Sequence, residues 1–171
     1  MRGDAGLEQR LQLDRWVFEP GVPANAVPAD PDVFMGVDIA ADHFAEGSAP
    51  PQGWAGWTTD ERLRFLNRLP REQRRERLDR LERAFGLNAI GNNELRFAWL
   101  SLAVANRYDP ALASLEDFVT RLGRRKFVRP LYLALHKDES WGRPIAARLY
   151  PRARPIYHPL VTGELDKLFG R

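Results

Sequence analysis

Residues 92–105 read NNELRFAWLSLAVA, a pattern whose apolar positions leave little of a helical surface polar. Asn92 or Asn93 can cap this helix, because a short polar side chain accepts hydrogen bonds from the first unpaired backbone amides. The apolar positions cover most sides of the helix rather than one stripe, and they are Leu95, Ala98, Trp99, Leu102, Ala103 and Val104. We therefore expect this helix to be buried at the centre of the fold.

Shorter amphipathic helices are predicted upstream of the central helix. Asp32 can cap a helix that runs to about residue 45, where Gly47 ends it. Thr58 and Glu61 have the spacing of a capping box at the start of the next helix. Gly86 follows a third helical pattern and is expected to end it.

The downstream half is also predicted to be helical. Asp109 can start a helix that Gly123 ends in the left-handed conformation, and Pro130 is compatible with the first turn of the next helix. Two more apolar patterns cover residues 140–149 and 160–169. No segment of comparable length alternates like a half-buried strand.

Seven or eight short helices without a strand signal predict an all-α fold. Tight turns between the helices favour a layered, solenoid-like stack of helix pairs over a four-helix bundle. Because the sequence has no fixed repeat period, we expect the solenoid to be irregular.

The composition supports a domain with its own core, since 44% of the residues are hydrophobic and 29% are charged. No apolar run approaches the ~20 residues of a membrane-spanning helix, and the first 25 residues lack the pattern of a signal peptide. The absence of cysteine excludes disulfides, thiolate metal sites and a cysteine nucleophile. We expect a reducing, cytoplasmic setting.

The first 30 residues are predicted to form an arm or linker. Pro20, Pro23, Pro28 and Pro31 lie close together, and each removes a backbone hydrogen-bond donor. The apolar residues within 11–18 predict that part of the arm packs either on this domain or on a missing neighbour. Residues 31–171 are expected to form the helical domain.

The net charge of +3 hides an uneven distribution along the chain. Residues 1–50 carry 3 basic and 9 acidic side chains, whereas residues 121–171 carry 12 basic and 4 acidic ones. The C-terminal third should therefore attract anions, which leaves nucleic acid, a membrane surface or an acidic small ligand open.

Motifs of self-contained catalysis are absent from the sequence. His43, His136 and His158 are widely separated, and no HExxH pair exists for a metal. The arginine-rich stretch 71–83 has acidic residues interleaved at helical spacing, which predicts a salt-bridged, solvated surface rather than a nucleic-acid face.

Residues 123–130, GRRKFVRP, contain the candidate binding residues. If Arg124 to Lys126 form an extended connector, alternation aims Arg124 and Lys126 to one side and Arg125 to the other. A guanidinium and an ammonium before a helix N-terminus suit a carboxylate or a phosphate. The alternative is a solvated basic loop that contributes only to solubility.

Several stretches together resemble one family. They are LNAIGNNELRFAWL at 87–100, GRRKFVRPLY at 123–132, YHP at 157–159 and LDRWVFEPGVP at 13–23. They look like the C-terminal domain, and the segment before it, of the leukotriene A4 hydrolase and aminopeptidase B group of zinc aminopeptidases, peptidase family M1. The resemblance spans nearly the whole chain.

This resemblance implies an irregular two-layer right-handed α-solenoid, an armadillo/HEAT-like superhelix of antiparallel helices that closes one side of a peptide channel. In the family, the basic pair of the G-R-x-K-F motif holds the free carboxylate of the substrate, and these positions correspond to Arg124 and Lys126. The zinc motif, the general-base glutamate and the site for the peptide amino terminus belong to a preceding catalytic domain.

The resemblance thus predicts the C-terminal domain of a zinc metallo-aminopeptidase, a hydrolase, with no metal or other cofactor in this chain and no catalysis by the chain alone. Its partners would be the catalytic domain of the same polypeptide and a peptide with a free C-terminal carboxylate. The competing hypothesis is a non-enzymatic helical scaffold that binds RNA or an acidic protein through the basic C-terminal third.

Overall fold

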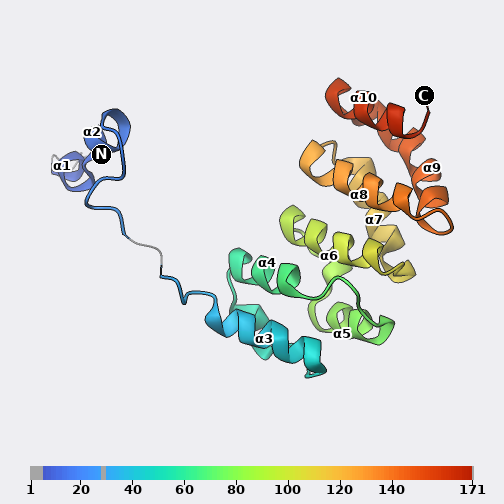
Figure 1. Cartoon of the computed structure of the whole chain (residues 1–171), viewed down its shortest axis with the longest axis horizontal. Helices are drawn as coiled ribbons and strands as arrows, with labels where there is room; N and C mark the ends of the chain where they lie inside the picture. The colour runs from blue at the N-terminus through green and yellow to red at the C-terminus, as the bar shows by residue number, and fades with distance from the viewer. Residues whose placement is uncertain (1–5, 28–29, 171) are drawn as a thin grey trace. The chain divides into compact units, whose positions relative to one another are not determined.

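The computed structural model describes residues 6–27 and 30–170, and all regular secondary structure in them is helical (Figure 1). The all-α prediction is therefore confirmed for the described residues. The chain divides into two compact units, residues 1–33 and residues 34–171. None of the helices in the described part is both long and apolar enough to cross a membrane.

The first unit contains two short helices, α1 (Leu7–Leu11) and α2 (Leu13–Phe18), which the proline pattern did not predict. Gln12 joins them in the left-handed conformation, with φ 51°. The Trp16 indole donates to Asn25 Oδ1 (3.1 Å), and Asn25 Nδ2 donates to the Leu11 carbonyl (2.9 Å), so the following loop folds back on the helices. Neither helix buries a side chain.

The second unit is a stack of helices in two layers (Figure 1). They are α3 (Met35–Glu46), α4 (Thr59–Arg68), α5 (Arg75–Phe85), α6 (Asn93–Ala105), α7 (Leu112–Arg121), α8 (Arg125–Lys137), α9 (Gly142–Ala153) and α10 (Pro159–Leu168). In one layer α4, α6, α8 and α10 pack in succession, and in the other α7 packs on α9. Helices that follow one another along the chain also pack together, as α3 does with α4 and α8 with α9. The armadillo/HEAT-like solenoid and its right-handed sense stay predictions.

Local signals set several helix ends. The capping box is present, because Thr58 Oγ1 accepts from the Glu61 amide (3.3 Å) and Glu61 Oε2 accepts from the Thr58 amide (2.7 Å). Gly47 and Gly86 end α3 and α5 with φ of 117° and 59°. The prediction for Asp32 is wrong, because α3 begins at Met35 with Phe34 at the N-cap position.

Helix α6 lies at the centre of the core, as its sequence predicted. Asn92 caps it by accepting hydrogen bonds from the amides of Glu94 and Leu95 (2.9 and 3.3 Å). Trp99 is fully buried, and its indole donates to Asn88 Oδ1 (2.8 Å). The helix buries Leu95, Ala98, Trp99, Leu100, Leu102, Ala103 and Val104.

Candidate functional site

The candidate site lies where α7 ends and α8 begins. The predicted left-handed Gly123 is wrong, because α7 already ends at Arg121 and Gly123 has no positive φ. A side chain at this position would instead be tightly packed. A Cβ at position 123 would lie 3.0 Å from the Ile156 carbonyl oxygen and 3.3 Å from the Tyr157 ring. The absence of a side chain lets the turn before α10 pack against this connector.

Helix α8 begins earlier than predicted, so Arg125 and Lys126 lie in its first turn and not in an extended connector. Arg124 is the N-cap residue, with an extended backbone. Pro130 lies inside the helix, where its missing N–H leaves the Lys126 carbonyl without the usual helical donor. Tertiary packing offsets this cost, because α8 buries Phe127, Val128, Leu131, Tyr132 and Leu135.

The Phe127 side chain lies near both predicted binding residues. Its ring is buried between Phe97 and Phe118, with centroid distances of 5.3 and 5.7 Å. The guanidinium carbon of Arg124 lies 5.6 Å from the centre of the Phe127 ring, and Lys126 Nζ lies 4.8 Å from it. Both cations are therefore held beside one ring, at distances typical of cation–π contacts. We call Arg124 and Lys126 the carboxylate site, after the role that the family resemblance predicts for them.

The neighbouring cations differ in their partners. Arg125 Nη2 and Arg129 Nε bind the two oxygens of Glu164 on α10 (2.6 and 2.5 Å), and the Arg125 hydrogen bond is the main cause of the lowered pKa of Glu164. Lys126 pairs with Glu94 at the start of α6. Arg124 is exposed and has no ion pair with any described residue.

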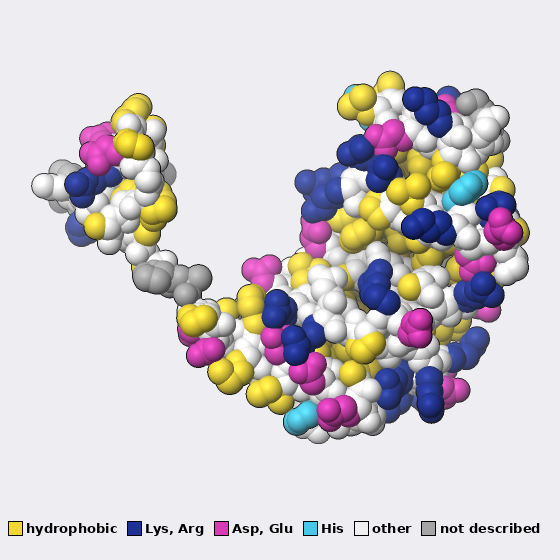
Figure 2. Space-filling model, in the orientation of Figure 1, with side chains coloured by type: hydrophobic (Ala, Val, Ile, Leu, Met, Phe, Trp, Pro, Cys, Tyr) yellow, Lys and Arg dark blue, Asp and Glu magenta, His cyan; other side chains and the backbone are white. Residues whose placement is uncertain are grey.

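The N-terminus of α8 has the electrostatics of an anion site. No side chain caps it, and its first turn contains no acidic residue. Helix dipoles place partial positive charge at this end, so consecutive cations here are unfavourable unless an anion is near. Figure 2 shows Lys and Arg side chains gathered where α8 begins, with acidic side chains beside them.

Most other cations of the basic C-terminal third are neutralised by partners across the fold. Glu116 of α7 pairs with Arg148 and Arg152 of α9, and Asp166 pairs with Arg154. Arg121 and Arg143 pair with acids four residues earlier in the chain. Within residues 121–170, the Lys and Arg side chains in no ion pair with a described residue are Arg124, Lys137 and Lys167. The excess of basic residues in the sequence is therefore not a continuous unpaired surface.

The predicted salt bridges along residues 71–83 are not present. Asp79 accepts a hydrogen bond from the Tyr108 hydroxyl (2.7 Å), and Glu82 accepts from the Asn88 amide (2.9 Å). Arg80 instead donates to the carbonyls of Gly47 and Ser48. These polar groups connect α5 to neighbouring segments, because acceptors far along the chain compete with those one helical turn away.

The histidines do not gather. His158 is the N-cap of α10, where its Nδ1 accepts from the Leu160 amide (3.2 Å), in agreement with the predicted turn position. The described residues contain no group of three or more His, Asp or Glu side chains that could hold a metal.

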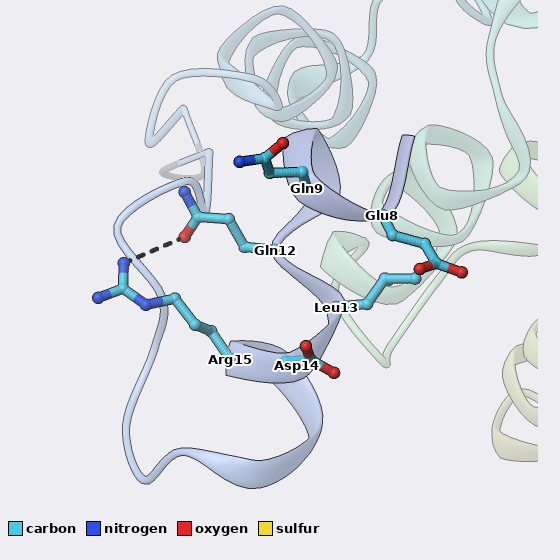
Figure 3. A pocket seen from close by; sticks show the side chains of 6 residues that line it. All are labelled: Glu8, Gln9, Gln12, Leu13, Asp14 and Arg15. Atoms are coloured by element: carbon cyan, nitrogen blue, oxygen red, sulfur yellow. Dashed lines mark hydrogen bonds between the residues drawn. The ribbon is translucent and has the colours of Figure 1, made fainter. Parts of the chain in front are cut away.

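Two of the larger hollows among the described residues lie outside the carboxylate site. One of about 540 Å³ lies between α1 and α2, where exposed or partly exposed side chains line it and Arg15 donates to Gln12 Oε1 (3.4 Å; Figure 3). A groove of about 380 Å³ runs between α8 and α10, where Arg129 and Glu164 bind one another and Lys167 is exposed to solvent. Neither presents an unpaired buried polar group.

Comparison with known proteins gives one family match. The family model "Leukotriene A4 hydrolase, C-terminal" matches residues 57–169, which include α4 to α10. The carboxylate site lies inside the matched region.

The curated relatives have one name in common. "Leucine aminopeptidase 2" of Pyricularia oryzae is 30% identical over 159 residues, which is 90% of this chain and 25% of the relative. The protein of the same name from Neurospora crassa is 31% identical over 123 residues (70% and 18%), and that from Emericella nidulans is 27% identical over 173 residues (96% and 28%). The chain therefore spans 18–28% of the length of these relatives.

Proposed function

This chain belongs to the family of leukotriene A4 hydrolase C-terminal domains, and we propose that it lines the peptide channel of a zinc aminopeptidase of peptidase family M1. In that enzyme, Arg124 and Lys126 bind the free C-terminal carboxylate of the peptide. The zinc ion, which activates the attacking water, belongs to the catalytic domain of the same polypeptide. The C-terminal domain formed by this chain is catalytically inert when it is separated from the catalytic domain.

No group of three or more His, Asp or Glu side chains among the described residues could hold a metal. We assign Arg124 and Lys126 a positioning role. Binding of the peptide at its far end fixes its register relative to the reacting bond, which lowers the entropic part of the barrier.

The unpaired state of Arg124 is the observation that carries this proposal. Its neighbours Arg125 and Lys126 each have a carboxylate within the fold, whereas Arg124 has none among the described residues. A planar guanidinium can bind both oxygens of a carboxylate, and Lys126 beside the same ring adds a second positive charge. The free amides at the start of α8 also favour an anion.

A scaffold that binds RNA or an acidic protein through the basic third is not favoured. Most cations of that third lie in ion pairs, so a polyanion would have to compete with internal carboxylates.

The test compares free-acid and C-terminally amidated peptides in the aminopeptidase that contains this domain. We expect Arg124→Ala to weaken transition-state binding of free-acid peptides by about 1.5–3 kcal/mol, the range for hydrogen bonds to charged groups. Amidated peptides should be nearly unaffected, because they lack the charge that is bound. The matched control is Arg121→Ala, which removes an exposed arginine paired only with Asp117 one turn away. Equal losses on both peptide classes in a folded Arg124→Ala enzyme would refute the proposal.

A further inference from the structure

Helices α6 and α8 begin at the same edge of their layer. They pack side by side, and the ion pair between Glu94 and Lys126 joins their first turns. Two positive helix ends therefore lie close together, and Glu94 is the acidic residue in the first turn of α6, whereas α8 has none in its own.

The carboxylate of Glu94 is not needed to cap α6. Asn92 already accepts hydrogen bonds from the Glu94 and Leu95 amides. The hydrogen bond of the Glu94 carboxylate is with Lys126 Nζ. This pair is accessible to a competing ligand, because the side chains of Lys126 and Glu94 are 47% and 40% exposed.

We propose that Glu94 is an internal competitor that sets the affinity of the carboxylate site. It occupies Lys126 when no substrate is bound, so an incoming carboxylate gains the whole charge of Arg124 but only part of the charge of Lys126. A bound carboxylate also has Glu94 as a like-charged neighbour. This inference rests on the proposed function, because it concerns how strongly the same site holds a substrate.

The physical cost of this competition is small but measurable. Exposed ion pairs contribute from nothing up to about 1 kcal/mol, which corresponds to at most about a fivefold change in affinity. Removal of the Glu94 charge should therefore improve binding of a free-acid peptide without creating a new site.

The experiment measures KM and kcat of the aminopeptidase that contains this domain, with trialanine and trialanine amide as substrates. We expect Glu94→Gln to lower KM for trialanine about two- to fivefold and to leave the KM for the amide unchanged. In a Lys126→Ala background, the same substitution should give little or no gain. Glu116→Gln is the matched control, because it removes a carboxylate of α7 that pairs with Arg148 and Arg152 of α9 and with neither cation of the carboxylate site.

The outcomes separate this inference from the proposed function. If Arg124→Ala weakens trialanine selectively while Glu94→Gln gives no selective gain, the competitor role is wrong and the carboxylate site stands. A gain that persists in the Lys126→Ala background would also overturn the inference, because Glu94 would then not act through Lys126. If Arg124→Ala has no acid-selective effect, the proposed function fails and the inference fails with it. Thermal unfolding of each variant establishes that it is folded.

Discussion

Arginines at two places in this domain differ in whether a carboxylate of the domain binds them. Between α3 and α4, Arg64 binds both oxygens of Asp38 (2.7 and 2.8 Å), and Arg68 binds both oxygens of Asp42 (2.8 and 2.7 Å). At the start of α8, Arg124 has no carboxylate partner among the described residues. The arginines between α3 and α4 are therefore neutralised within the domain, whereas Arg124 is available to bind a ligand.

The difference shows that the number of basic residues is a poor guide to binding. Asp38 and Asp42 are one helical turn apart, as are Arg64 and Arg68, so each arginine meets its own acid. Hydrogen bonds from Arg64 and Arg68 are the main causes of the lowered pKa values of the two aspartates. At the start of α8, Glu164 pairs with Arg125 and Glu94 pairs with Lys126, and no described carboxylate pairs with Arg124.

Reversing the charge of Arg124 and, separately, of Arg64 should give the largest difference between an effect on peptide binding and an effect on stability. Arg124→Glu puts a negative charge where the substrate carboxylate binds, and like charges side by side cost several kcal/mol. We expect a loss of more than about 3 kcal/mol in transition-state binding of free-acid peptides, read from kcat/KM, with an unchanged midpoint of thermal unfolding.

Arg64→Glu is the counterpart between α3 and α4. It opposes Asp38 instead of binding it, so the unfolding midpoint should fall while the preference for free-acid over amidated peptides stays unchanged. A loss of that preference in Arg64→Glu, or unfolding of Arg124→Glu, would erase the distinction between the two places.

Lys126→Ala should have a smaller effect than Arg124→Ala. An ammonium lacks the two-pronged geometry of a guanidinium, and Glu94 already holds Lys126. We expect the loss for free-acid peptides to stay below about 1.5 kcal/mol, the lower limit for a hydrogen bond to a charged group. If Lys126→Ala lowers kcat/KM for free-acid peptides more than Arg124→Ala does, Lys126 and not Arg124 is the main ligand of the carboxylate.

Thr58→Ala should reduce stability alone. It removes the side-chain acceptor of the capping box at the start of α4 and should lower the free energy of unfolding by about 1 kcal/mol. Urea unfolding measures this change, and Thr59→Ala, one residue into the helix, is the control. A change in peptide preference with Thr58→Ala would mean that α4 and the carboxylate site are coupled.

The smallest predicted effect is the acid sensitivity of the α3–α4 pairs. Because the pKa values of Asp38 and Asp42 are lowered in the folded state, their stabilisation is present above the ordinary aspartate pKa near 4 and is lost as the pH falls through the lowered values. The double variant Asp38→Asn, Asp42→Asn should therefore lose less stability than the parent between pH 5 and pH 3. Equal slopes of unfolding free energy against pH would show that these pairs do not stabilise the fold.

Local chemistry made the helix ends at Gly47, Thr58, Gly86 and Asn92 predictable, because each signal acts within about four residues. The start of α8 was not predictable in this way. Pro130 suggested a first turn, but packing of the buried face holds the helix together around it.

The candidate site was found from sequence only in part. Its residues stood out by charge, and the resemblance of GRRKF to a family motif gave them a role. Their partners were hidden, because Glu94 lies 32 residues before Lys126 and Glu164 lies 39 residues after Arg125. Pairs at such separations are set by the stacking of helices and not by any local pattern.

The most direct test of the central claim is a crystal structure of the aminopeptidase that contains this domain, with a non-hydrolysable free-acid tripeptide analogue bound. We expect the terminal carboxylate to lie within hydrogen-bond distance, about 3 Å, of the Arg124 guanidinium and near Lys126 Nζ. A well-ordered peptide whose carboxylate is bound by other groups, with Arg124 still in solvent, would contradict this claim.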